Sequence, residues 1–245
     1  MSNSIGVFGA AVVLGYFLLP IFLSKEQIKF FLAHTTNAES AWRDGILKFL
    51  TDRLGFITPN FVSYVGLILV FLVAYPFQND AHYGWIFFVT LLAGFSDMLD
   101  GSLARNTSRV TKLGAVLDVA RDLLLVVVLS YYLIITSHLS EQLFFWFAIG
   151  WIFLGGVRSM EFKFSSGKTF SLEEDYKFVL DRLRLFLYVA GILFLILIPL
   201  AKDFRDLGET FIVISIVISW ISLLFHSAHL KILREDEEEG DGLTI

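Results

Sequence analysis

The sequence predicts an all-α polytopic membrane protein: a six-helix transmembrane core bundle with an extra N-terminal transmembrane helix and an interfacial amphipathic helix. Hydrophobic residues make up 56% of the 245 residues, and charged residues only 18%. Several apolar runs approach the ~20 residues that a membrane-spanning helix needs. These runs are continuous rather than alternating, which disfavours a β-barrel. The absence of cysteine excludes disulfides, thiolate metal sites and a cysteine nucleophile.

The first 57 residues are predicted to form two elements that precede the core. Residues 4–23 are apolar, and neither a basic segment before them nor a cleavage site after them indicates a signal peptide. We interpret them as a spanning helix, although Pro20 and three glycines leave a membrane-surface segment as the alternative. In residues 24–57 apolar and charged residues fall on different helical faces, as in an amphipathic helix at the membrane interface. A linker helix packed on the bundle is the alternative.

The core domain is expected over residues 58–232, with an acidic disordered tail over 233–245. Its six helices are predicted at about 60–77, 83–105, 112–137, 141–158, 176–200 and 207–231. Most Lys and Arg residues fall between these spans on one side, whereas only Lys202 and Arg205 fall on the other. The positive-inside rule therefore places the crowded side in the cytoplasm. We expect the membrane to be the plasma membrane. The link between the second and third core helices belongs to that side.

Four aspartates flank this link. Asp97 and Asp100 lie three residues apart, and Asp118 and Asp122 lie four apart. On helices, each pair shares one face. Carboxylates in so apolar a setting are expensive, and they usually mark an ion, proton or catalytic site.

Two facing helices would bring the four carboxylates together. Their mutual repulsion would be relieved by one or two divalent cations, and all-oxygen ligands suit Mg²⁺ or Mn²⁺. Small residues on the acidic faces, among them Gly101, Ala104 and Gly114, let another helix or a bulky phosphate come close. The alternative is a buried polar network between packed helices.

The aspartates belong to the pattern D-x2-D-G-x2-A-R-x8-G-x3-D-x3-D, which runs from Asp97 to Asp122. This pattern resembles, without deviation, the signature of the CDP-alcohol phosphotransferase family. The resemblance implies transfer of a phosphatidyl or phospho-alcohol group from a CDP-linked donor to a hydroxyl acceptor, with release of CMP. It further implies two Mg²⁺ or Mn²⁺ ions held by Asp97, Asp100, Asp118 and Asp122, with Asp122 also as general base, and a homodimer.

The donor site is expected along the same pattern. Gly101, Ala104 and Gly114 would leave space for the nucleotide. Arg105 would pair with a phosphate, because its guanidinium offers a bidentate fork, although an ordinary cytoplasmic charge is the alternative. Arg121 is expected to turn to another helical face and to form a buried ion pair.

A second, looser string, T-P-N-x2-S-x2-G, begins the first core helix and resembles a family motif near the cytidine. Its residues are Thr58, Pro59, Asn60, Ser63 and Gly66. Helix capping by Thr58 and Pro59 would explain part of it equally.

The acceptor site is assigned to Arg158 and Lys168. Arg158 with Glu161, and later Gly167-Lys168-Thr169, partly resemble phosphatidylglycerophosphate synthases. A basic pocket would suit a phosphorylated acceptor such as glycerol 3-phosphate, but the positive-inside rule explains the same charges.

The interpretation is therefore a phosphatidyltransferase of phospholipid biosynthesis that works in the lipid bilayer on CDP-diacylglycerol or another CDP-alcohol. Within the same chemistry, the alternative is a choline- or ethanolamine-type phosphotransferase acting on diacylglycerol. A divalent-cation transporter and an inactive scaffold are alternatives from other classes. Nothing in the composition indicates nucleic-acid binding.

Overall fold

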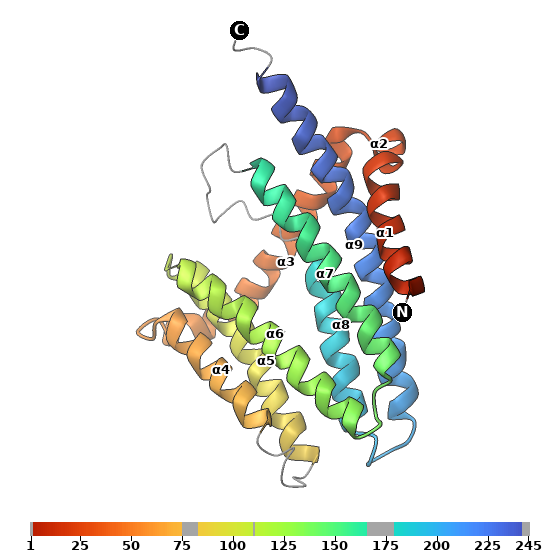
Figure 1. Ribbon diagram of the computed structural model, residues 1–245. Helices are drawn as coiled ribbons and strands as arrows, with labels where there is room; N and C mark the ends of the chain where they lie inside the picture. The colour runs from red at the N-terminus through yellow and green to blue at the C-terminus, as the bar shows by residue number, and fades with distance from the viewer. Residues whose placement is uncertain (1, 75–82, 110, 166–178, 242–245) are drawn as a thin grey trace. The chain divides into compact units, whose positions relative to one another are not determined.

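A computed structural model describes residues 2–74, 83–109, 111–165 and 179–241, and the elements assigned in these ranges are α-helices (Figure 1). The chain divides into two compact units. The first comprises Met1–Asn37, Gln142–Tyr188 and Phe211–Ile245. The second comprises Ala38–Glu141 and Val189–Thr210.

The first unit contains the N-terminal helices and parts of several later ones. Its elements are α1 (Ser2–Phe17), α2 (Leu19–Phe22), the start of α3 (Lys25–Arg53), nearly all of α7 (Glu141–Ser165), the start of α8 (Val179–Ile196) and most of α9 (Phe204–Asp241). Phe8 of α1, Leu154 of α7 and Leu223 of α9 share its buried apolar core. The predicted helix over 4–23 is interrupted at Leu18, between α1 and α2. Pro20 lies in the first turn of α2, where a missing backbone N–H is tolerated.

The second unit is built on three neighbouring helices, α4 (Pro59–Ala74), α5 (Tyr83–Asn106) and α6 (Lys112–Ile135). α4 packs against both α5 and α6, and the three lie side by side in Figure 1. The link between α5 and α6 is tight: Ser108 adopts a left-handed φ of 53°, and the N–H of Arg109 donates to the carbonyl of Ala104 at 2.8 Å. Thr111 then caps α6, since its Oγ1 accepts from the N–H of Gly114 at 3.0 Å.

Four helices of the described residues are long and apolar enough to cross a membrane. They are Tyr83–Asn106, Glu141–Glu161, Phe204–Glu238 and the stretch Ser4–Phe22, in which α1 and α2 together form one candidate span; α4 is apolar but shorter. The prediction of an all-helical membrane protein is therefore confirmed for the described residues. The six-helix core and the interfacial position of α3 stay predictions, as do the domain limits at residues 57 and 232.

The last helix differs most from its predicted extent. α9 continues to Asp241, so that residues 233–241, expected in a disordered tail, are helical. Side chains one turn apart support this extension, with Lys231 3.7 Å from Glu235 and Arg234 3.0 Å from Glu238. Lys25, at the start of α3, also lies 3.5 Å from Glu235. The predicted start of the fifth core helix, at 176, falls outside the described residues.

Candidate active site

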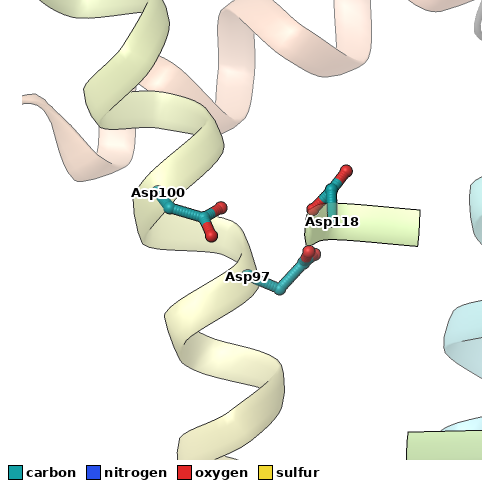
Figure 2. A group of neighbouring side chains, drawn as sticks. All are labelled: Asp97, Asp100 and Asp118. Carbon is teal, nitrogen blue, oxygen red and sulfur yellow. The ribbon is translucent and has the colours of Figure 1, made fainter. Parts of the chain in front are cut away.

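Three of the four aspartates converge between α5 and α6. Asp97 and Asp100 lie near the end of α5, and Asp118 lies in the second turn of α6. Each offers a carboxylate oxygen, and these oxygens lie within 4.8 Å of one another. Figure 2 shows the three carboxylates turned toward a shared space from two helices. Asp122 follows Asp118 by one turn, and its Oδ1 lies 3.9 Å from Nη2 of Arg121.

Arg121 lies at the centre of this cluster. Its Nη1 donates to Oδ2 of Asp100 at 2.7 Å, and its Nη2 donates to Oδ1 of Asp118 at 2.6 Å and to Oδ1 of Asp97. The side chain is 1% exposed. Arg121 therefore forms the buried ion pair that the sequence predicts. The prediction that it turns to another face of its helix than the aspartates is wrong. Because Arg121 follows Asp118 by three residues, both project from nearly the same side of α6.

α4 closes the cluster from a second side. The hydroxyl of Ser63 donates to Oδ2 of Asp100 at 2.7 Å. One turn later stands Gly66, where an added Cβ would lie 2.4 Å from Oγ of Ser96 and 3.0 Å from Cδ of Arg121. Only a glycine at this position lets the arginine side chain pass beside α4 without displacing its neighbours.

The start of α4 also contacts the start of α6. The hydroxyl of Thr111 donates to Oδ1 of Asn60 at 2.9 Å. Gly114 lies beside both groups, since its Cβ would stand 3.0 Å from that Oδ1 and 3.1 Å from Oγ1 of Thr111. Pro59 begins α4 and is buried, whereas Thr58 is exposed. The string from Thr58 to Gly66 thus supplies side chains to the aspartate cluster and to the cap of α6.

Arg105 binds a carboxylate that the sequence pattern does not contain. Its Nε donates to Oδ2 of Asp44 at 2.6 Å and its Nη2 to Oδ1 at 2.7 Å, a bidentate ion pair. Ser102 donates to the same carboxylate at 2.8 Å. Gly101 borders the guanidinium, with Nη1 3.4 Å from its ideal Cβ position, and Ala104 is half-buried in the same turn of α5. Asp44 was not predicted as a site residue, because 61 residues separate it from Arg105.

Of the two residues assigned to the acceptor, Arg158 lies in the first unit. Arg158 of α7 donates to Oδ2 of Asp181 at 3.4 Å, and Lys168 falls outside the described residues. Asp181 belongs to a buried network with His226, whose ring nitrogens lie 3.1 Å from it and 2.8 Å from Glu161. Sequence spacing could not reveal this network, because its members come from three helices.

Arg184, on the next turn of α8 after Asp181, is buried as well. Its Nε and Nη1 have no hydrogen-bond partner among the described residues, and its guanidinium lies 5.9 Å from the centre of the Trp151 ring. A buried guanidinium with unused donors is suited to an anionic ligand.

The aspartate cluster fits a hard divalent cation in its chemistry. Its donors are carboxylate oxygens from two rigid helices, the ligand type that Mg²⁺ and Mn²⁺ prefer. Oxygens of the same carboxylates already bind Arg121, so the guanidinium supplies one positive charge to the cluster.

The fold and site define an all-helical membrane protein with a carboxylate cluster that could hold a cation. The family profile named CDP-alcohol phosphatidyltransferase matches residues 56–226, which include α4 to α8 and the whole aspartate cluster. The chain belongs to this family. No solved structure matches the chain significantly.

Curated relatives match shorter parts of the chain. An archaetidylinositol phosphate synthase of Pyrococcus horikoshii is 41% identical over 27% of this chain and 35% of its own length. A CMP-forming cardiolipin synthase of Streptomyces coelicolor is 39% identical over 29% of this chain and 35% of its own. A protein of Mycobacterium bovis named as a cardiolipin synthase is 31% identical over 41% and 46%. The matched segments span less than half the length of these relatives.

Proposed function

We propose that this protein transfers a phosphatidyl group from CDP-diacylglycerol to a hydroxyl acceptor, releasing CMP, at the cytoplasmic face of the plasma membrane. The observation that carries the proposal is the meeting of Asp97, Asp100 and Asp118 between α5 and α6. Family membership supports the CDP-alcohol chemistry. The spans of α5 and α9 support a substrate whose acyl chains remain in the bilayer.

The reaction forms a bond between the acceptor oxygen and phosphorus and breaks the bond from phosphorus to the CMP oxygen. The aspartates Asp97, Asp100, Asp118 and Asp122 are the residues that would hold divalent metal. When bound, Mg²⁺ or Mn²⁺ supplies positive charge that neutralises the pyrophosphate. Asp122, on the exposed side of the cluster, receives the proton from the acceptor hydroxyl. The protonated carboxyl then returns its proton to water after CMP leaves.

The donor site follows the first turns of α4 and the end of α5. Thr58, Pro59 and Asn60 border the cytidine end. Ser63 and Gly66 position the acidic cluster rather than the nucleotide, because Ser63 already donates to Asp100 and Gly66 borders Arg121.

The diphosphate end is assigned to the segment from Gly101 to Gly114. Arg105 binds the diphosphate with donors that Asp44 leaves unused, since Asp44 engages Nε and Nη2 of a group with five N–H donors. Gly101, Ala104 and Gly114 leave the space that the phosphates need.

The acceptor site is assigned to Arg158 and Lys168, joined by Arg184. The unused donors of Arg184 favour an anionic acceptor, such as glycerol 3-phosphate, over a neutral alcohol. The relatives are named for two chemically different products, an archaetidylinositol phosphate and a cardiolipin. Acceptors of each chemical class therefore have to be tested one at a time.

A release assay tests the function. Purified protein in lipid nanodiscs receives radiolabelled CDP-diacylglycerol, Mn²⁺ and one acceptor at a time: glycerol 3-phosphate, inositol phosphate or phosphatidylglycerol. Parallel arms offer CDP-choline or CDP-ethanolamine with diacylglycerol. We expect CMP with one acceptor, loss of CMP on EDTA treatment and recovery with Mn²⁺. CMP in a CDP-choline or CDP-ethanolamine arm would reassign the donor, and absence of CMP in every arm would contradict the proposal.

A further inference from the structure

The four carboxylates of the site divide into a buried part and an open part. The side chain of Asp100 is 6% exposed, whereas those of Asp97, Asp118 and Asp122 are 37%, 42% and 28% exposed. A dissolved cation and a water-borne substrate reach the open part. The buried part is Asp100 with Arg121.

Arg121 is fixed in place by neighbours on two other helices. Its Cδ and Nη1 lie 3.0 and 3.2 Å from the position of a Cβ at Gly66, so this stretch of α4 is shaped around the arginine. Its Nη1 binds the oxygen of Asp100 that also accepts from Ser63. Moving the guanidinium out would leave Asp100 buried with no cationic partner among the described residues, which is costly.

The guanidinium of Arg121 also lowers the net negative charge of the carboxylates that attracts a metal ion. The four carboxylates carry four negative charges and Arg121 returns one positive charge, whereas Arg105 pairs with Asp44. In the absence of substrate, two divalent cations beside a fixed guanidinium would place five positive charges against the four negative charges of the carboxylates. One divalent cation leaves the cluster slightly negative. A carboxylate has lone pairs on two oxygens, so Asp97 and Asp118 can bind Arg121 and a metal at once.

We infer that Arg121 permanently fills one of the two cation positions of this site. The chain then holds a single divalent cation, bound by Asp97, Asp118 and Asp122, and Asp100 is a positioning residue for the guanidinium rather than a metal ligand. This inference rests on the metal site of the proposed function. It departs from the two ions that the sequence pattern implies and from Asp100 as one of their ligands.

The number of bound ions tests the inference without any turnover. Full-length protein in nanodiscs is titrated with Mn²⁺, and free Mn²⁺ is followed by its EPR signal. We expect one tightly bound Mn²⁺ per chain. Arg121→Gln, which keeps much of the side-chain length but not the charge, should bind two. The matched control is Arg205→Gln, whose ion pair with Glu209 lies outside the cluster; it should bind one.

Single aspartate variants separate ligands from the positioning residue. Asp97→Asn and Asp118→Asn should weaken Mn²⁺ binding by about 100-fold or more. Asp100→Asn should weaken it by only about tenfold, because a residue that acts on the metal through another group costs about 10–100-fold in affinity when it is lost. Two Mn²⁺ per wild-type chain, one Mn²⁺ in a folded Arg121→Gln protein, or equal losses at Asp97 and Asp100 would each overturn the inference. If Arg121→Gln does not fold, the number of Mn²⁺ ions bound by the wild type decides, together with the number bound by Arg121→Lys. We expect one ion per chain in each case.

These outcomes are distinct from failure of the function itself. Two bound ions with CMP release would leave the proposed reaction intact and remove only the role of Arg121. A chain that binds no Mn²⁺ and releases no CMP would contradict both proposals.

Discussion

Nη1 of Arg121 and the hydroxyl of Ser63 meet the same oxygen, Oδ2 of Asp100, each at 2.7 Å. The three residues come from α6, α4 and α5. A single carboxylate oxygen thus joins the three helices of the candidate site, in a place where water has almost no access. Its removal should affect the fold as well as the chemistry.

Asp100→Ala should lower the free energy of unfolding by about 1–3 kcal/mol, because it leaves the donors of Ser63 and Arg121 without their shared acceptor. Thermal unfolding in detergent measures the loss. Asp206→Asn, an exposed aspartate of α9, is the matched control and should leave the midpoint unchanged. Equal midpoints for both variants and the wild type would show that Asp100 has no such structural role.

Asp122→Asn should reduce CMP release by at least about 100-fold, since the amide cannot take up the acceptor's proton. Its unfolding midpoint should stay close to that of the wild type, because the side chain is partly exposed. Glu209→Gln, in an exposed ion pair of α9, is expected to retain full release. Near-normal release by Asp122→Asn would remove this residue as the base.

Gly66→Ala should destabilise the protein by about 1–3 kcal/mol, the usual cost of overpacking. The new methyl group would stand 2.4 Å from Oγ of Ser96 and would press on the Arg121 side chain. At Gly94 of α5 an added Cβ meets nothing within 4 Å, so Gly94→Ala should be neutral or slightly stabilising. Thermal unfolding of the two variants makes the comparison, and indistinguishable midpoints would contradict the packing argument.

Asp44→Asn should loosen the second half of α3 from α5. The change removes the charge that holds Nε and Nη2 of Arg105, a contact of about 1.5–3 kcal/mol for hydrogen bonds between charged groups. Amide hydrogen exchange of residues 44–53 should accelerate by about tenfold or more. Asp52→Asn, exposed on the same helix, should leave exchange unchanged. Faster exchange in both variants would mean that the helix responds to its net charge instead.

The helices around the site were predictable because their signals are local. Thr58 and Pro59 start α4, and the apolar runs before Asp97 and after Asp122 set the lengths of α5 and α6. The convergence of Asp97 with Asp118 also follows from spacing along two helices joined by a short link. Each of these inferences needs only periodicity and neighbouring residues.

What escaped prediction depends on contacts between segments far apart in the chain. The position of Arg121 requires Gly66 on another helix, and a single-helix projection does not show that space. Arg105 faces Asp44 because α3 lies beside α5, which no spacing rule states. The acidic residues after 233 were expected to be solvated and disordered, whereas pairs such as Arg234 with Glu238 continue the helix.

The length of α9 has a consequence for the membrane surface. Its 38 residues span about 57 Å at 1.5 Å per residue, almost twice the ~30 Å thickness of the hydrocarbon layer. The helix must therefore emerge from the lipid as a stalk, carrying Glu235, Asp236 and Glu238 into the aqueous phase.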